Sequence, residues 1–299
     1  MPVVRIGTSE KDGTFWTEGE AIAGLLLRDH GISTEIMEAG KASIENARGL
    51  DEDRIDFGFM ASNWIGRAYH GETPFAREID ISMIAPVNCG AMFFITKKDS
   101  GLRTVRDMVG KRVCIGPKGS GMVQHIHTIF GVLGIGFDEF TPVHMSFEDG
   151  GRALETGDVD AQWQCPYPNA VMRAISKRID VRVLSYEPDD LAAVLGNVEF
   201  YRRANMPVGL FRGVEVETEQ VAVVNIVASH ARFDREVVHS FVSTILFNLE
   251  ELSIINPLFG GLDIIFEGLR SEGSKSLEFG GVPLHPGALQ AYRDAGYLS

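Results

Sequence analysis

The chain has 299 residues, 44% of them hydrophobic and 23% charged, which is the composition of a globular protein long enough for two lobes. The formal net charge of −13 argues against nucleic acid and against an anionic membrane surface as partners. A small organic anion remains possible, because salt screens distant charges while a local cradle of donors acts at close range. The sequence contains no run of about 18 apolar residues, so we expect no direct membrane insertion.

Strand and helix patterns alternate along the first third of the chain, which is typical of an α/β fold. Glycine-bearing loops at Gly7 and Gly40 each follow a predicted strand and lead into a predicted helix. The last two apolar runs of this part are expected to be separate strands at a crossover between lobes. The expected strands are 3–6, 34–37, 55–60, 81–87 and 92–95.

The second part of the chain repeats this alternation and then becomes helical. A strand at 113–115 leads through a glycine-rich turn into a helix that begins near Met122. A helix containing Arg152 and Leu154 precedes a strand that is entered at 157–161. The remaining expected elements are strands at 181–185 and 221–227, helices at 239–252 and 257–269, and a terminal segment from His285.

The glycine-rich turn at 116–121 is the first candidate site. A helix start presents unpaired backbone N–H groups and the positive end of the helix dipole. Glycines let such a backbone approach a ligand closely, and the spacing is neither that of a P-loop nor that of a dinucleotide fingerprint. We therefore expect Gly119, Ser120 and Gly121 to hold a carboxylate, phosphate or sulfonate. The alternative is a plain tight turn without a ligand.

Two further loops are expected to face the same ligand, because ligands of open α/β sheets collect outside the carboxyl ends of the strands. Trp16 either stacks on a planar ligand or packs in the core. Lys41 either supplies a charge to a carboxylate or is simply solvated. The candidate binding residues of these loops are Thr8, Gly13, Thr14 and Trp16 in the first, and Lys41, Ala42 and Ser43 in the second.

The sequence predicts neither a metal site nor a cofactor. His125 and His127 are two residues apart on a predicted helix and therefore point to different faces. The cysteines Cys89, Cys114 and Cys165 show no metal-ligand spacing, and no Ser-His-Asp arrangement is evident. Arg67, His70 and Arg152 are expected to face solvent.

The ordered motifs of the chain resemble those of the TAXI family, the extracytoplasmic solute receptors associated with TRAP transporters. The terminal His-Pro-Gly-Ala is especially characteristic. The matching pieces are Ile6-Gly7-Thr8, Gly13 to Trp16, Gly40 to Asn46, Asp56, Ser62-Asn63, Val105 to Val113, Gly116 to Gly121, Gly157 to Ala161, Tyr167 to Asn169 and Pro283 to Ala288.

This resemblance implies a type II periplasmic-binding-protein fold, with two α/β lobes, an interlobe cleft and a hinge. Lobe one would combine residues 1–88 with 207–299, and lobe two would span 89–206. The resemblance further implies a solute-binding protein that captures a small organic anion, a carboxylate or an amino-acid-like molecule, for a membrane permease of the TRAP type. Asn63 would then join the lobe-one wall, and Gln164, Cys165 and Tyr167 would line the wall of lobe two.

Two other functions remain open on the sequence alone. Met1 leads almost directly into a strand, so either a leader has been removed and the protein is periplasmic, or Met1 is the native start and the protein is cytoplasmic. A cytoplasmic protein of this fold would be a decarboxylase- or desulfinase-like enzyme, with Cys165 as the candidate catalytic residue, or a ligand sensor. We expect a monomer or a weak dimer in each case.

Overall fold

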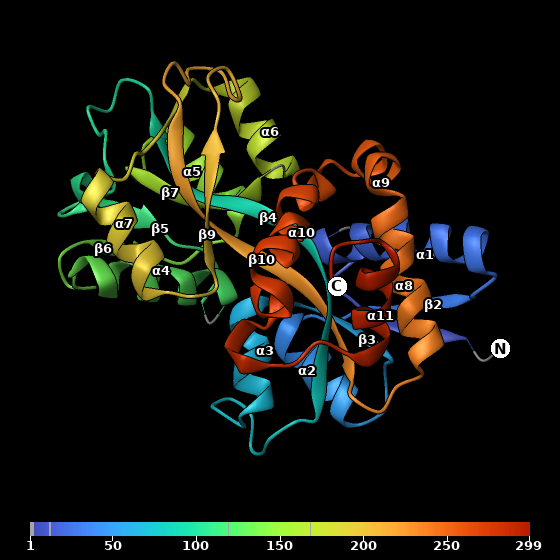
Figure 1. Ribbon diagram of the computed structural model, residues 1–299. Helices are drawn as coiled ribbons and strands as arrows, with labels where there is room; N and C mark the ends of the chain where they lie inside the picture. Colours follow the sequence, from blue (N-terminus) through green and yellow to red (C-terminus); the bar gives the residue numbers. More distant parts are fainter. Residues whose placement is uncertain (1–2, 12, 119, 168) are drawn as a thin grey trace. The chain divides into compact units, whose positions relative to one another are not determined.

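The computed structural model describes residues 3–11, 13–118, 120–167 and 169–299, without the side chains of Cys165 and Ala170. The chain divides into two compact units. Unit 1 contains residues 1–89 and 224–299, and unit 2 contains residues 90–223. The chain enters unit 2 inside strand β4 (Ile81–Lys97) and returns inside strand β10 (Thr218–His230) (Figure 1). Unit 1 is therefore built from both ends of the sequence and unit 2 from its middle.

The sheet of unit 1 has the strand order β2-β1-β3-β10-β4. Strand β1 (Val4–Gly7) pairs in parallel with β2 (Thr34–Met37) and with β3 (Phe57–Ala61), whereas β10 is antiparallel to β3. The helices of this unit are α1 (Thr14–His30), α2 (Ser43–Asp51), α3 (Ser62–Tyr69), α8 (Arg235–Phe247), α9 (Leu249–Ile255), α10 (Leu262–Glu272) and α11 (Pro286–Asp294), with 3-10 turns η2 (Pro257–Phe259), η3 (Gly273–Leu277) and η4 (Phe279–Gly281).

Apolar side chains of helices and strands form the core of unit 1. Helix α1 buries Phe15, Ile22 and Leu25 at helical spacing, as expected of an amphipathic helix that covers a sheet. On β3 the ring of Phe57 lies 4.4 Å from the ring of Phe241 on α8, measured between centroids. This packing fixes the ends of β1 and β3, from which the loops of the candidate site emerge.

The terminal His-Pro-Gly-Ala motif forms a helix-packing corner. His285 is buried, and its Nδ1 accepts a hydrogen bond from the backbone N–H of Gly287 at 3.1 Å, which caps α11. A Cβ atom at Gly287 would lie 2.3 Å from the carbonyl oxygen of Arg235, so only glycine lets α11 approach α8 this closely (Figure 1). The motif that is most characteristic of the resemblance therefore has a structural role in this chain.

The sheet of unit 2 has the strand order β4-β7-β5-β6. Strand β5 (Arg112–Cys114) pairs in parallel with β6 (Thr141–Val143) and with β7 (Ala161–Tyr167), and β7 is antiparallel to β4. Strand β8 (Val181–Val183) pairs with β4, and β9 (Tyr201–Met206) pairs with β10. The helices of this unit are α4 (Gly121–Leu133), α5 (Phe147–Thr156), α6 (Ala170–Arg178), α7 (Pro188–Asn197) and the 3-10 turn η1 (Val105–Met108).

The two units have the same strand–helix topology, and each contains an equivalent arginine–aspartate ion pair. In unit 1 the order is β1-α1-β2-α2-β3, and in unit 2 it is β5-α4-β6-α5-β7. Arg5 in β1 pairs with Asp56 through both its Nε and its Nη2, and Arg112 in β5 pairs with Asp160 in the same way. In both pairs the backbone N–H of the arginine also donates to the aspartate. The similarity of the two halves therefore extends from topology to individual side chains.

The structure corrects three expectations about the elements. The runs at 81–87 and 92–95 belong to the single strand β4, because Gly90 does not break the strand: a Cβ there would lie 2.4 Å from Cβ of Pro166. The helix expected at 239–252 is divided into α8 and α9, which are bent by 75°. The chain returns to unit 1 at 223–224 and not near residue 207, because the whole of β9 pairs with the first half of β10.

A membrane span among the helices of the described part of the chain would need both length and apolar character. No single helix there has the length and apolar character to cross a bilayer, and only α8 and α9 counted together reach both.

Candidate functional site

The glycine-rich turn of unit 2 joins β5 to α4. Gly116 has a φ of 94°, in the left-handed region that favours glycine. Ser120 is the N-cap residue of α4, yet its side chain makes no cap bond, and its Oγ is buried with no hydrogen-bond partner among the described residues. Gly121 is the first residue of the helix and is exposed. Gly119, the remaining residue predicted for this loop, lies outside the described residues.

A second serine in unit 2 shows what an N-cap serine ordinarily does. Ser146 precedes α5, and its Oγ accepts a hydrogen bond from the backbone N–H of Asp149 at 3.0 Å. Ser120 occupies the same position before α4 without making this bond. Its hydroxyl and the first N–H groups of α4 are therefore available to an outside acceptor.

Strand β7 brings a second predicted residue to the same end of the unit 2 sheet. Cys114, the last residue of β5, is paired with Gln162, so Gln164 lies just beyond the end of β5. Gln164 is fully buried, and neither its Nε2 nor its Oε1 has a hydrogen-bond partner in the part of the chain described. Tyr167 is half-buried and packs edge-on against Phe211 at 4.9 Å between ring centroids. The backbone of Cys165 belongs to β7, and its thiol is outside the described atoms.

In unit 1 some predicted residues are used by the fold itself. Thr8 is buried, and its Oγ1 donates to the carbonyl oxygen of Met37 at 3.0 Å, which ties the end of β1 to β2. Ser43 accepts a hydrogen bond from the backbone N–H of Ala61 at 3.1 Å and thereby holds α2 against the end of β3. A Cβ at Gly13 would lie 2.8 Å from the carbonyl oxygen of Glu10, so this glycine allows the tight entry into α1.

The second loop of unit 1 and the start of its first helix are more accessible. Lys41 is exposed, and Ala42 is half-buried with a φ of 38°. Thr14 is half-buried, and its carbonyl oxygen accepts a hydrogen bond from the hydroxyl of Thr17 at 3.0 Å. These residues lie in the predicted loops, but the structure does not give them a ligand-binding geometry.

Unpartnered polar atoms gather where α1 and α3 begin. Trp16 Nε1, Ser62 Oγ and Asn63 Oδ1 are all buried, and none has a hydrogen-bond partner within the described segments. Because β1 and β3 are parallel neighbours, the helices that follow them begin at the same end of the sheet. Buried polar groups are nearly always hydrogen-bonded in folded proteins, so these atoms indicate a place where water or a ligand is bound.

The sequence analysis missed Glu18 at this end of unit 1. Its carboxyl is fully buried, and its Oε1 accepts a hydrogen bond from Nδ2 of Asn88 at 2.6 Å. Asn88 Oδ1 in turn accepts from Nδ2 of Asn225 at 2.8 Å. Burial raises the pKa of Glu18 to about 8. The available signal was its spacing, because Glu18 falls on the apolar stripe of α1 between Phe15 and Ile22.

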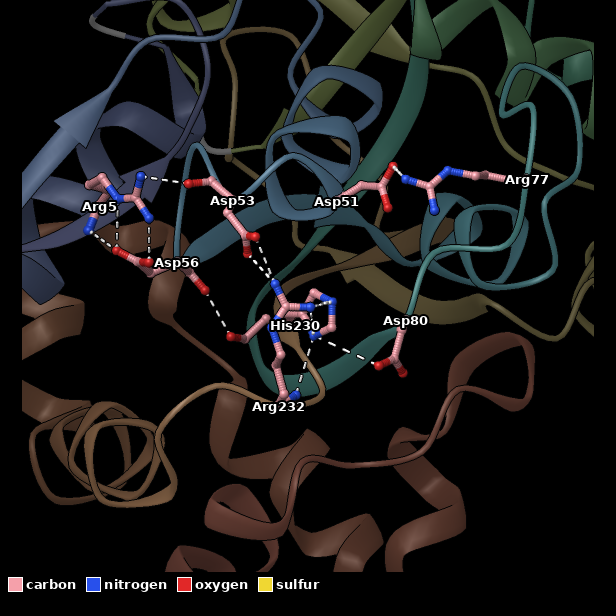
Figure 2. A network of polar contacts seen from close by, with 9 residues as sticks. Arg5, Asp51, Asp53, Asp56, Arg77, Asp80, His230 and Arg232 are labelled. Atoms are coloured by element: carbon pink, nitrogen blue, oxygen red, sulfur yellow. Dashed lines mark hydrogen bonds and ion pairs between the residues drawn. The ribbon is translucent and has the colours of Figure 1, made fainter.

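The opposite end of the same sheet carries a network of ion pairs (Figure 2). Nη2 of Arg5 lies 2.7 Å from Asp56 Oδ1, and Arg5 Nη1 donates to the carbonyl oxygen of Asp53 at 2.7 Å. Arg232 pairs with the Asp53 carboxylate at 2.5 Å. Figure 2 also shows the pairs Arg77–Asp51 and His230–Asp80, with nitrogen–oxygen distances of 2.7 Å and 3.8 Å.

A cavity of about 500 Å³ lies beside this network, lined by Arg5, His30, Asp56, Phe233, Asp234 and Glu236 among others. Three of its charged side chains are already engaged: Arg5 binds Asp56, and Asp234 caps α8 by accepting from the backbone N–H of Glu236. None of its described lining residues has a buried polar atom without a partner. We therefore place the candidate site at the other end of the sheet, where the polar atoms are unpaired.

Metal-binding and thiol chemistry find little support in the described residues. No group of three or more His, Cys, Asp or Glu side chains there could hold a metal ion. His125 is buried with its Nδ1 2.9 Å from the hydroxyl of Tyr201, whereas His127 is exposed and stacks on Phe137, so the two point to different faces as predicted. Burial raises the pKa of the Cys114 thiol, which disfavours the reactive thiolate.

The three residues expected to face solvent do so. Arg67, His70 and Arg152 are all exposed. The Arg67 guanidinium lies over the ring of Trp64 at 5.2 Å, and Arg152 pairs with Glu148 on its own helix.

Solved structures resemble this chain at low sequence identity. The periplasmic sulfonate-binding protein SsuA from Methylobacillus flagellatus KT, of a putative sulfonate ABC transporter, matches with a TM-score of 0.52 and 14% identity over 100% of this chain and 88% of that one. The aliphatic sulphonate binding protein SsuA from Escherichia coli has a TM-score of 0.47 and 17% identity over 99% and 84%. A periplasmic substrate-binding protein of an ABC transporter from Coxiella burnetii has a TM-score of 0.48 and 14% identity over 85% and 97%.

The likeness to the Methylobacillus protein confirms the predicted fold class, a two-lobed α/β fold of the periplasmic-binding-protein type. A family model matches residues 6–296, which is nearly the whole chain. The protein belongs to the NMT1-like family.

Proposed function

We propose that this protein is a solute-binding protein that captures a small organic anion. The observation that carries the proposal is a set of buried hydrogen-bond donors at predicted site residues that have no acceptor in the described part of the chain. Trp16 Nε1, Ser120 Oγ and Gln164 Nε2 can each donate to an oxygen of a carboxylate or sulfonate. Each lies at the carboxyl end of strands in its unit, where ligands of α/β sheets collect.

The proposed donors are the uncharged side chains of Trp16, Ser120 and Gln164. In each unit, neutral donors can hold an anion without a buried lysine or arginine, because oriented dipoles stabilise charge at short range. The Methylobacillus protein that resembles this chain is a sulfonate-binding protein, and both sulfonates and carboxylates present several acceptor oxygens. We infer that the ligand is one of these two classes.

The proposed binding set keeps the residues predicted from the sequence. In unit 1 it comprises Thr8, Gly13, Thr14, Trp16, Lys41, Ala42, Ser43 and Asn63, and in unit 2 it comprises Gly119, Ser120, Gly121, Gln164, Cys165 and Tyr167. Delivery to a membrane permease and a periplasmic location complete the proposal. The assignment to TRAP-associated TAXI receptors stays a prediction, because the family model that matches is that of the NMT1-like family and the Methylobacillus protein belongs to an ABC transporter.

A thermal-shift screen tests the ligand class. The panel contains ethanesulfonate, taurine, propionate, succinate and glutamate, with glucose as the neutral control and putrescine as the cationic one. We expect at least one acid to raise the melting temperature, because a ligand that binds only the folded state stabilises it. A shift with glucose or putrescine and none with the acids would contradict the proposal.

The two N-cap serines of unit 2 supply a matched pair of variants. Ser120→Ala should weaken binding of the best acid by about 1–2 kcal/mol and leave the free energy of unfolding nearly unchanged, because its hydroxyl has no partner among the residues that the structure describes. Ser146→Ala should lower the free energy of unfolding by about 1 kcal/mol and leave the affinity unchanged. Calorimetry and urea unfolding of both variants measure the two effects, and an unaltered affinity in Ser120→Ala would remove Ser120 from the site.

A further inference from the structure

Glu18 is a buried acid with one oxygen engaged and the other not. It is the fifth residue of α1, one turn beyond Thr14. Asn88 Nδ2 donates to its Oε1 at 2.6 Å, whereas Oε2 is buried with no hydrogen-bond partner in the residues that the structure describes. When an amide N–H donates to one oxygen of a neutral carboxyl, that oxygen is the carbonyl and the proton resides on the other. Oε2 is then a hydroxyl that lacks an acceptor.

The position of Glu18 connects it to the proposed site. The next residue, Gly19, packs on the end of β1, since a Cβ there would lie 2.8 Å from Cγ2 of Thr8. Asn225, which completes the Glu18–Asn88–Asn225 chain, is paired with Ala61, the residue directly before Ser62. The free oxygen of Glu18 therefore belongs to the same end of the unit 1 sheet as the unpartnered atoms of Trp16, Ser62 and Asn63.

The equivalent residue of unit 2 has a hydrogen-bond partner from its own unit. His125 is the fifth residue of α4, the helix that corresponds to α1 in the shared topology. It is also buried, and its Nδ1 lies 2.9 Å from the hydroxyl of Tyr201. Both units thus place a titratable side chain at the same helical position. Of these two side chains, only Glu18 keeps a buried polar atom without a hydrogen-bond partner among the described atoms.

We propose that Glu18 is a specificity-determining residue of the anion site, and that its Oε2 hydroxyl donates a hydrogen bond to an oxygen of the bound anion. This inference rests on the proposed function. A neutral acid can serve an anion in this way, whereas an ionised carboxylate at the same place would repel it. Anion binding is consequently linked to the proton on Glu18.

No neighbouring charged group shifts the pKa of Glu18. Burial raises the pKa of Glu18 and the Asn88 hydrogen bond lowers it, and no neighbouring charge contributes. Helices α8 and α9 pack on α1, and two of their ionisable side chains form ion pairs away from Glu18: His239 with Asp294, and Glu251 with Arg28 at the far end of α1. The other three, Arg235, Glu236 and Glu250, do not shift the pKa of Glu18.

Isothermal calorimetry with ethanesulfonate and propionate, whose charges are constant above about pH 6.5, tests the proposal. Wild-type affinity should be constant near neutral pH and fall by about tenfold per pH unit above about pH 8, as expected when one proton must stay bound. Glu18→Gln keeps a carbonyl for Asn88 and supplies an amide donor in place of the hydroxyl. It should bind within about threefold of wild type and lose the pH dependence. Glu18→Leu should bind at least about tenfold more weakly.

His125→Gln is the matched control and should retain the wild-type pH profile of binding above neutral pH. Circular dichroism checks that each variant is folded, and the isosteric Glu18→Gln keeps the test decisive if Glu18→Leu does not fold. An equal pH dependence in wild type and Glu18→Gln would overturn the inference while leaving the proposed function intact. A preference for taurine over ethanesulfonate that grows with pH would also overturn it, since an ionised Glu18 would then be meeting an ammonium group. If neither probe nor any acid of the screen binds, the proposed function fails and this inference fails with it.

Discussion

The two ends of the unit 1 sheet treat polar groups in opposite ways. At the amino ends of β1 and β3, Arg5 and Asp56 form a two-point ion pair within the network of Figure 2. At the carboxyl ends, Trp16, Ser62 and Asn63 bury polar atoms with no partner in the described structure. A paired group stabilises the fold, whereas an unpaired buried group destabilises it until something binds. The difference therefore separates residues that maintain the structure from residues that serve a ligand.

The largest expected effect concerns Glu18 and the pH dependence of stability. Its folded pKa of about 8 is above the unfolded value of 4.5, so the stabilisation is complete below pH 4.5 and lost as pH rises to about 8. The loss amounts to roughly 5 kcal/mol at most, from about 1.4 kcal/mol per pH unit. Urea unfolding of wild type and Glu18→Gln across this range measures it, and the variant should lack the decline.

His125 opposes Glu18 over part of this range. Burial lowers its pKa from 6.5 to about 4, so its contribution is present above pH 6.5 and is lost as pH falls to about 4. The two slopes should nearly cancel between about pH 4.5 and 6.5, and the wild-type decline should show mainly between pH 6.5 and 8. A free energy of unfolding that stays level from pH 6.5 to 8 would show that Glu18 is not held neutral.

Removal of Asp56 should have the next largest effect. Asp56→Ala leaves the Arg5 guanidinium and backbone N–H without their acceptor and should lower the free energy of unfolding by about 2 kcal/mol. Asp160→Ala in unit 2 should cost somewhat less, because the Asp160 side chain is 33% exposed and that of Asp56 only 15%. Ligand affinity should be unchanged in both. A loss of affinity in Asp56→Ala with stability intact would reverse the roles assigned to the two ends.

Trp16→Phe should produce the complementary result. It removes the unpartnered Nε1 donor and keeps an aromatic ring, so the free energy of unfolding should change by less than about 1 kcal/mol in either direction. Affinity for the best acid should fall by about 1–2 kcal/mol in calorimetry. Unfolding at markedly lower urea with normal binding would assign Trp16 to the core, the other interpretation that its sequence position allowed.

Lys41→Ala should have the smallest effect. The side chain is exposed, so the free energy of unfolding should change by less than about 0.5 kcal/mol. Any loss of anion affinity should shrink as salt rises, because an exposed charge is screened. Titrations at low and high ionic strength measure this, and a salt-independent loss would mean that Lys41 contacts the ligand directly.

The sequence was most informative where local chemistry decides the structure. The glycine-rich turn after the strand at 113–115 predicted a helix that begins near Met122, and α4 begins at Gly121. It was misleading at Gly90, which looked like a break between two strands. The glycine instead allows Pro166 to approach β4, a contact between residues far apart in sequence. Close approach of distant segments leaves no periodic signal, and for this reason β4 was divided in two.

The site residues on loops could be predicted from the sequence, whereas those whose role depends on distant partners could not. Loop residues such as Trp16 and Ser120 could be named because loops after parallel strands collect ligands. Glu18 could not be assigned a role, since its meaning depends on Asn88 and Asn225, which β4 and β10 bring to it. Whether a hydroxyl such as that of Thr8 is engaged by the fold also depends on a distant partner, in this case Met37.

The division of unit 1 between the two ends of the chain has a consequence for synthesis on the ribosome. Strand β10 lies between β3 and β4, so both strands keep an unpaired edge until residue 230 has been made. Helix α8 likewise lacks its packing partner α11 until Asp294, the last residue of α11, has been made. Unit 2 is contiguous and is complete once residue 223 has been made. A nascent chain of this protein therefore exposes the edges of β3 and β4 until residue 230 has been made and leaves α8 without α11 until residue 294, and these are the intervals in which a chaperone would bind it.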